Sequence, residues 1–240
     1  MSVWDHVAGV QAAVMLRSQI AAGDVPHAWL LQGPAGASKT AVAVTMAAAL
    51  ECPVEPLEGC GECSSCLRVR RRRHPDVHHI VAEGPLIPVD TIREFVIPEA
   101  NRSTFEGSYK VFIIEEAERM NPAAQNALLK TLEEPQPGTI FILTCDRDEE
   151  LLETVQSRCQ VIRLTPLSEE RIVQLLEKEG ADHASALVAA RISEGDVNRA
   201  RALAFEEAAR ERRSAWIHLA RRIETPADAL DAAQEILEEA

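Results

Sequence analysis

The chain lacks the features of a membrane-bound or exported protein. Among its 240 residues no apolar run approaches the roughly 18 residues that cross a bilayer, and residues 1–6 show no signal-peptide pattern. We therefore expect a cytoplasmic protein without a membrane partner. Internal repeats and low-complexity linkers are also missing, which excludes a repeat array.

An excess of positive charge is missing as well. The formal net charge is −13, from 25 lysines and arginines against 38 aspartates and glutamates. This balance excludes a protein whose whole surface binds nucleic acid, although a local basic patch can still do so. A hydrophobic content of 46% is ordinary for a globular protein, and the length suits one larger domain or two smaller ones.

Residues 33–40 read GPAGASKT and match the phosphate-binding loop G-x-x-x-x-G-K-[ST] at all but one position. Ser38 replaces the second glycine, and its Cβ costs room where the backbone approaches a phosphate. The segment is therefore a weakened nucleotide site, the relic of one, or a chance turn between a strand and a helix. The residues expected around the phosphates and Mg²⁺ are Gly33, Gly36, Ser38, Lys39 and Thr40.

The flanking segments favour the nucleotide interpretation. Residues 27–32 form a short apolar run that is typical of a buried parallel strand. Residues 41–50 are rich in alanine and predict a helix. A strand, a glycine loop and a helix are the structural context that this motif requires.

A second part of a nucleotide site lies at residues 110–116, a β-branched run that ends in two acids. This pattern predicts a Walker B strand, in which the first acid holds Mg²⁺ and the second polarises the attacking water. The first acid is usually aspartate. Glu115 carries one more methylene, which displaces its carboxylate from the Mg²⁺ position, and Glu116 stands at the position of the base. A strand that ends in acids by chance is the alternative.

Four of the six cysteines lie close together in the sequence, and their spacing predicts a closed site for structural Zn²⁺. An iron–sulfur cluster is the alternative, because C-x2-C-x2-C resembles ferredoxin spacing. Three nearby histidines, His74, His78 and His79, are interpreted as spectators, and Cys145 and Cys159 as buried core thiols. The expected ligands are Cys52, Cys60, Cys63 and Cys66.

A basic run follows the cysteines at residues 68–73. It predicts either a solvated helix face at the edge of the zinc module or a patch that contacts DNA or a partner protein. No aromatic residue interrupts the run, so stacking on bases is not expected there.

The remaining pattern alternates strands and helices and then becomes wholly helical. This alternation predicts an α/β fold with a doubly wound parallel sheet and its ligand at the carboxyl ends of the strands. Pro122 and Pro135 bound one helix, and Ser168 is the expected N-cap of another. The expected helices are 123–135, 151–156, 168–179, 184–193 and 197–210, with one or two more over 206–222 and 227–239, and the expected strands are 139–145 and 160–164.

Several of these segments together resemble the bacterial clamp-loader branch of the AAA+ proteins, over residues 4–205. The strand HAWLLQGP at 27–34, the cysteine insert after the loop helix, ALLKTLEEP at 127–135 and Ser-Arg-Cys at 157–159 carry the resemblance. It implies an AAA+ P-loop domain over 1–165, with a zinc module at about 51–74, and a small helical lid domain over 166–205.

Within this branch the resemblance offers two classes, the ATP-hydrolysing gamma/tau motors and the delta-prime subunits. Motors carry a complete Gly-Lys-Thr loop and an Asp-Glu pair, and this chain departs from both at Ser38 and Glu115. Motors also place a sensor-2 arginine at the position of Asn198, whereas Arg199 is one position off. These departures favour the delta-prime class, with weak or absent ATPase activity and weak ATP/Mg²⁺ binding.

The resemblance also assigns roles to two single residues. Arg158 matches the arginine finger that points into the ATP site of the neighbouring subunit, and Thr144 matches the sensor-1 position. The alternative for Arg158 is an ion pair with an acid on its own domain surface.

As a member of this branch the chain is expected to help load the sliding clamp onto primed DNA as part of the DNA polymerase III holoenzyme. Its expected partners are the gamma/tau and delta subunits, the sliding clamp and, through the complex, primer–template DNA. The tail at 206–240 is short for the helical collar of the family, which predicts a reduced or missing collar. The alternatives are a gamma/tau-like motor and a non-replicative AAA+ nucleotide-binding protein.

Overall fold

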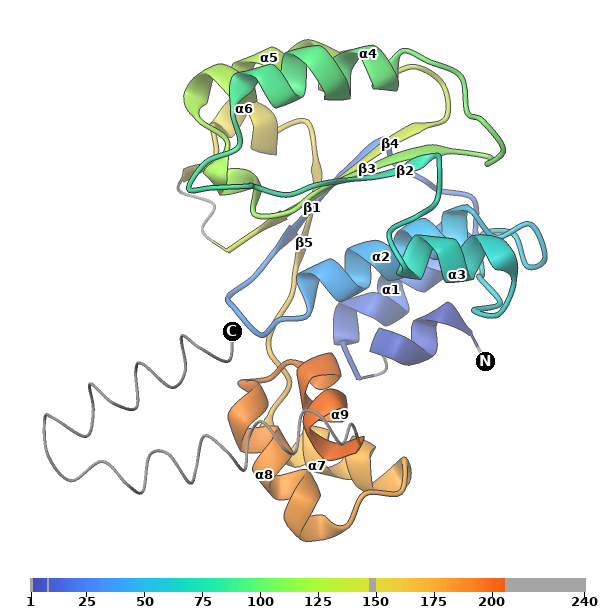
Figure 1. Ribbon diagram of the computed structural model, residues 1–240, viewed down its shortest axis with the longest axis vertical. Coiled ribbons are helices and arrows are strands. Elements are labelled where there is room, and N and C mark those ends of the chain that lie inside the picture. The colour runs from blue at the N-terminus through green and yellow to red at the C-terminus, as the bar shows by residue number, and fades with distance from the viewer. Residues whose placement is uncertain (1, 8, 147–149, 206–240) are drawn as a thin grey trace, which may run out of the picture.

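A computed structural model describes residues 2–7, 9–146 and 150–205 of the protein (Figure 1). A five-stranded parallel sheet of order β2-β3-β4-β1-β5 lies at its centre. The three inner strands are almost completely buried, as expected for strands that are covered on both faces. The strands are β1 (Ala28–Gln32), β2 (Val77–Ile80), β3 (Lys110–Ile114), β4 (Thr139–Cys145) and β5 (Gln160–Arg163).

Helices cover both faces of the sheet, so that the fold is doubly wound (Figure 1). One face packs against α1 (Gln11–Ala21), α2 (Lys39–Leu50) and α3 (Ser64–Arg70), with a 3₁₀ turn at Val3–Val7. The other face carries a π-helical turn and a 3₁₀ turn together with three helices. These elements are Thr91–Val96, Ala117–Arg119, α4 (Ile97–Ala100), α5 (Pro122–Glu133) and α6 (Glu153–Gln156).

The last three described helices form a bundle with its own apolar cluster. They are α7 (Glu169–Lys178), α8 (His183–Ser193) and α9 (Val197–Phe205). Ser168 caps α7 as predicted, since its hydroxyl accepts the Arg171 N–H at 3.3 Å, and Asp182 caps α8 in the same way.

The predicted doubly wound parallel sheet is confirmed. The sequence analysis did not predict β2, α1, α4 or the π-helical turn. It placed a helix face at the basic end of α3 only as one of two alternatives, and α6 begins later than the predicted residue 151. The predicted helices beyond residue 205 lie outside the described residues. No helix in the described part of the chain is both long and apolar enough to span a bilayer.

Candidate nucleotide site and cysteine centre

The phosphate-binding loop follows β1 at the carboxyl edge of the sheet, where α/β folds bind their ligands. Ser38, at the start of α2, is buried and has φ = 56° and ψ = 29°, which is the left-handed conformation that glycine adopts freely. Its buried hydroxyl has no hydrogen-bond partner. The serine therefore keeps the backbone shape of the motif at a conformational cost.

Lys39 is almost completely buried and is fully engaged within the chain. Its Nζ donates to the carbonyl oxygens of Gly33 at 2.6 Å and Pro34 at 2.8 Å. It also forms an ion pair of 2.6 Å with Asp146, which follows β4. The lysine thus points at its own loop and at an acid of the neighbouring strand end.

Glu115 and Thr40, which are far apart in the sequence, meet at this edge. The Thr40 hydroxyl donates to Glu115 Oε2 at 3.1 Å. The other carboxylate oxygen lies 2.9 Å from Nη2 of Arg72 and 3.5 Å from Nδ1 of His79, as charge contacts rather than aligned hydrogen bonds. Burial raises the pKa of the Glu115 carboxyl, but these contacts outweigh it and lower the pKa below its usual value.

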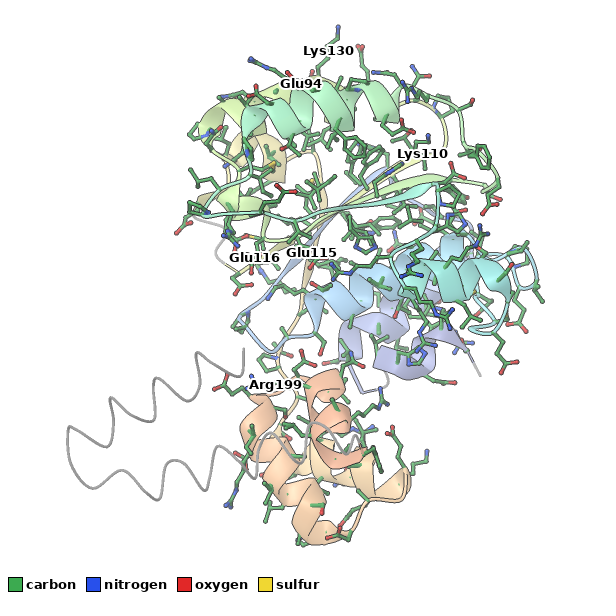
Figure 2. All side chains as sticks on the ribbon, viewed as in Figure 1. Glu94, Lys110, Glu115, Glu116, Lys130 and Arg199 are labelled. Carbon is green, nitrogen blue, oxygen red and sulfur yellow. The ribbon has the colours of Figure 1, made fainter. Side chains whose placement is uncertain are left out.

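Glu116 lies beside Glu115 at the end of β3 (Figure 2). Its backbone N–H donates to the Thr144 hydroxyl at 3.0 Å, so the expected sensor-1 residue contacts the expected Walker B segment. The Glu116 carboxylate is 55% exposed and pairs with Arg119 at 2.6 Å. Arg119 thus holds the Glu116 carboxylate at the surface of the protein.

The loop also touches the helical bundle. Gly36 has φ = 81°, and a Cβ there would lie 2.2 Å from the carbonyl oxygen of Glu194, between α8 and α9. Asp196 caps α9 through the N–H groups of Asn198 and Arg199. The side chain of Arg199 is exposed, on the side of the bundle that faces the sheet domain (Figure 2).

Arg158 lies at the amino ends of the strands, whereas the phosphate-binding loop lies at their carboxyl ends. It precedes β5, whose first residue, Gln160, pairs with Trp29 at the start of β1. Its guanidinium donates to the carbonyl oxygen of Thr154 at 2.7 Å and forms an ion pair with Glu133 of α5. The alternative expected from the sequence, an ion pair on the chain's own surface, is therefore present.

The four predicted cysteine ligands come together after α2. Their sulfur atoms all lie within 4.8 Å of one another, and Cys52 lies 3.7 Å from Cys60 and 3.9 Å from Cys63. Ligands about 2.3 Å from a tetrahedral Zn²⁺ lie about 3.8 Å apart. The spacing therefore fits a single ion, whereas the several atoms of an iron–sulfur cluster need more space between their ligands.

Backbone N–H groups point at sulfur atoms of these ligands, whereas burial raises the pKa of the Cys63 and Cys66 thiols. The N–H groups of Glu55 and Cys60 point at the Cys52 sulfur, at 3.3 and 3.4 Å. Those of Glu62 and Cys63 lower the pKa of the Cys60 thiol to about 7. Such N–H···S contacts orient metal ligands and stabilise their charge.

The other cysteines and the histidines lie outside this centre, as predicted, within the described residues. Cys145 is fully buried. Cys159 is only partly buried, because it lies in the turn before β5, although burial raises the pKa of its thiol to about 12. His79 and His74 nevertheless make contacts, since His79 lies 3.5 Å from Glu115 and His74 joins a partly buried polar cluster.

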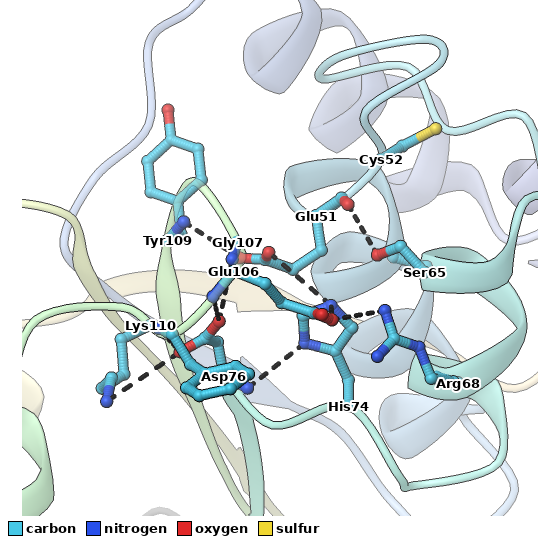
Figure 3. Close-up of polar contacts among 12 residues, drawn as sticks. Glu51, Cys52, Ser65, Arg68, His74, Asp76, Glu106, Gly107, Tyr109 and Lys110 are labelled. Carbon is cyan, nitrogen blue, oxygen red and sulfur yellow. Dashed lines mark hydrogen bonds and ion pairs between the residues drawn. The ribbon is translucent and has the colours of Figure 1, made fainter.

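This polar cluster consists of Glu51, His74, Asp76, Glu106 and Lys110 (Figure 3). The fully buried carboxylate of Asp76 accepts three N–H groups of the loop 105–107, at 2.6 to 2.9 Å. Burial raises the pKa of Asp76, but these N–H groups outweigh it and lower the pKa. Glu51 accepts the Tyr109 N–H at 3.0 Å, and burial raises the pKa of its carboxyl to about 8. The cluster joins the cysteine centre to the sheet.

Sequence reasoning missed the ion-pair partners of the candidate site. Asp146 could have been found, because it directly follows a predicted strand at the edge where ligand-binding groups gather. Arg72 carried no such signal, because its contact with Glu115 depends on how the cysteine module packs against the sheet. The basic run is accordingly not a uniform solvated face, since Arg68 pairs with Glu106 and Arg72 with Glu115.

Residues 10–168 match the family model described as DNA polymerase III, delta subunit. The chain is 32% identical over 189 residues to subunit delta' of Bacillus subtilis, a match that covers 78% of this chain and 57% of the relative. It is 36% identical over 186 residues to subunit delta' of Escherichia coli, covering 76% and 55%. Subunit tau of B. subtilis is 36% identical over 153 residues, covering 63% and 27%.

Two solved structures share the fold of this chain. A gamma subunit-related protein of DNA polymerase III from Thermotoga maritima superposes with a TM-score of 0.53 at 22% identity, covering 95% of this chain and 72% of the other. The RuvB Holliday junction branch migration motor of the same organism gives a TM-score of 0.50 at 17% identity, covering 79% and 57%.

The chain spans about half the length of the delta' relatives that it matches. The family model nevertheless covers well over half of this chain, and the relatives in several bacteria carry the same subunit name. The chain therefore belongs to the delta-prime family of DNA polymerase III clamp-loader subunits.

Proposed function

We propose that the chain works as the delta-prime subunit of the cytoplasmic DNA polymerase III clamp loader and helps to load the sliding clamp onto primed DNA. In this proposal it assembles with the gamma/tau and delta subunits, and meets the clamp and primer–template DNA through the complex. Arg158 acts in trans as an arginine finger on the ATP of a neighbouring motor subunit. The chain's own ATPase activity is weak or absent.

The position of Arg158 carries this proposal. The phosphate-binding loop lies at the carboxyl end of β1, whereas Arg158 precedes the amino end of β5, which runs parallel to β1. Strand β5 alone spans roughly 10 Å. Arg158 is thus separated from the loop of its own chain, and a role of this guanidinium in phosphoryl transfer has to be exerted on another subunit.

The candidate site on this chain supports the absence of self-contained hydrolysis. Glu115 is paired with Arg72, and Glu116 with Arg119. Each carboxylate thus has an arginine counter-ion of this chain in place of the Mg²⁺ or water that phosphoryl transfer requires. The similarity to tau keeps a gamma/tau-like motor as the second candidate. Steady-state ATP turnover by the purified chain, abolished by Lys39→Ala, would favour the motor. The cysteine insert and Ser-Arg-Cys together argue against a non-replicative AAA+ protein.

The test is ATP hydrolysis by a clamp loader reconstituted with this chain, in the presence of clamp and primed DNA. We expect Arg158→Ala to assemble normally and to lower stimulated hydrolysis by about tenfold or more, because the charge on the γ-phosphate loses its partner. Arg158→Lys should restore little, since an ammonium lacks the planar fork of the guanidinium.

Glu133→Ala is the matched control, because it breaks the same ion pair and leaves the guanidinium in place. A finger predicts that Glu133→Ala complexes hydrolyse ATP at the unmodified rate or faster. Equal effects of Glu133→Ala and Arg158→Ala, or no effect of either, would contradict the arginine finger. Arg158 would then contribute only a surface ion pair with Glu133, which is worth at most about 1 kcal/mol of stability.

A further inference from the structure

Three charged side chains stand at the candidate nucleotide site, one from the phosphate-binding loop and two from the end of β3. Each of them pairs with an oppositely charged side chain of this chain. Lys39 pairs with Asp146 at 2.6 Å, Glu115 with Arg72 at 2.9 Å, and Glu116 with Arg119 at 2.6 Å. Of these pairs, the one between Arg72 and Glu115 lies where a divalent cation would be expected, because Glu115 also contacts Thr40.

Arg72 reaches this position from the end of α3, the helix that carries Cys66. The Arg72 N–H bonds the Val69 carbonyl at 2.9 Å, and the Arg73 N–H bonds the Arg68 carbonyl at 2.8 Å, which together form a Schellman motif. Arg72 is the residue with φ = 56°, a position at which glycine is usual. The left-handed backbone at this position favours glycine, which has no side chain. Arg72 nevertheless stands there, and its long charged side chain contacts the carboxylate of Glu115.

Mg²⁺ does not fit this arrangement. It requires an octahedral set of oxygen ligands, which in nucleotide sites come from a threonine hydroxyl, carboxylates, water and phosphates. Here the Thr40 hydroxyl donates to Glu115 Oε2, and the guanidinium lies 2.9 Å from Oε1. Oε2 already accepts the Thr40 hydroxyl, and Oε1, which has no hydrogen-bond partner, faces the guanidinium, so the position of the cation is already filled by positive charge.

We propose that the Arg72 guanidinium replaces the divalent cation beside Thr40 and Glu115, so that the loop does not favour Mg²⁺-bound nucleotide over free nucleotide. This makes Arg72 a specificity-determining residue of the nucleotide site. The inference rests on the proposed function in one respect, because it explains why this chain's own loop is inactive while Arg158 serves a neighbour.

The test is a titration of the full-length chain with a fluorescent ADP analogue, in Mg²⁺ and in EDTA. The wild-type chain should bind the analogue no more tightly in Mg²⁺ than in EDTA. Arg72→Gly should gain an affinity in Mg²⁺ at least about tenfold higher than in EDTA, because Glu115 becomes free to hold the cation. Glycine also suits the left-handed backbone, so this variant should keep the wild-type circular dichroism and melting temperature or exceed the latter.

Arg71→Gly is the matched control, because it removes the same charge from the same helix end without a contact to Glu115; it should behave as wild type. Arg72→Lys keeps a cation near the carboxylate and should gain less than Arg72→Gly. In the double variant Arg72→Gly/Glu115→Gln the Mg²⁺ effect should disappear. The proposal is overturned if the wild-type chain already prefers Mg²⁺-ADP by tenfold, or if Arg72→Gly shows no Mg²⁺-dependent binding. Either result leaves the role of Arg158 untouched.

Discussion

At the scale of single residues, backbone strain is concentrated around the nucleotide loop. Five non-glycine residues in the described part of the chain have a positive φ, and four of them surround this loop. Ser38 lies in the loop, Arg72 pairs with Glu115, Glu116 directly follows Glu115 after β3, and Glu194 lies against Gly36. Each such residue costs on the order of 1 kcal/mol, and strain of this kind persists where the surroundings impose it. The surrounding structure therefore still imposes the conformation of the phosphate-binding loop, although the consensus glycine is replaced by Ser38.

Asp76 offers a prediction for a single side chain. We expect Asp76→Asn to lower the free energy of unfolding at neutral pH by about 1–3 kcal/mol, because an amide accepts fewer of the three N–H bonds and carries no charge. The pKa of Asp76 is lowered in the folded state. Its contribution is therefore fully present above the unfolded-state pKa of about 3.9 and is lost as the pH falls through the folded-state pKa.

Urea titrations of both proteins at several pH values would measure this effect. The difference between wild type and variant should be largest near neutral pH and should shrink below about pH 4. Asp90→Asn, at an exposed aspartate, is the control and should change little. A constant difference at all pH values would contradict the role assigned to the carboxylate charge.

At the scale of elements, the sequence predicted the strands and helices whose own residues carry a full apolar run or clear start and stop signals. Strands β1, β3 and β4 are continuous apolar runs, and helix α5 carries its own N-cap and stop signals. Strand β2 (VHHI) was missed because two histidines interrupt it, and in the fold His78 stacks on Phe112 while His79 faces Glu115. The ion pairs of the candidate site depend on packing between distant elements, which periodicity does not encode.

The cysteine centre gives a prediction for an element. Purified protein should contain one Zn²⁺ per chain, and Cys63→Ser should lose it together with several kcal/mol of stability, because the free energy of metal binding contributes to folding. Serine can still cap helix α3 at this position, so the loss would come from the metal. Elemental analysis and thermal melts with and without chelator would measure both. Cys159→Ser, outside the centre, should retain the metal. A metal-free wild-type protein, or a coloured one with iron–sulfur absorbance, would refute this prediction.

At the scale of the whole molecule, Arg201 ties the helical bundle to the start of the chain. Its guanidinium pairs with Glu179 at 2.6 Å and donates to the carbonyl oxygens of His6 at 2.8 Å and Asp5 at 3.2 Å. The contact between Gly36 and Glu194 is a second connection between the bundle and the sheet domain. These contacts tie the bundle both to the start of the described chain and to the nucleotide loop.

Loss of the Arg201 contacts should therefore loosen the N-terminal turn. We expect Arg201→Ala to lower the local opening free energy of residues 3–7 by about 1–3 kcal/mol, because the two carbonyl oxygens lose a charged donor. Hydrogen–deuterium exchange of these amides would measure it. Arg199→Ala, on the same helix but exposed, should leave their exchange unchanged. Equal protection in both variants would show that the turn is held by its apolar contacts alone.

The order of the strands also has a consequence for how the protein is made. Strand β1 leaves the ribosome first, yet both of its neighbours, β4 and β5, begin only at Thr139 and Gln160. At about 5–20 residues per second, its wholly apolar centre, Trp29 to Leu31, waits roughly 5–20 s for a partner strand. Of the five strands of this sheet, β1 therefore stays longest without a partner strand during synthesis, and its apolar side chains can make wrong contacts in that time.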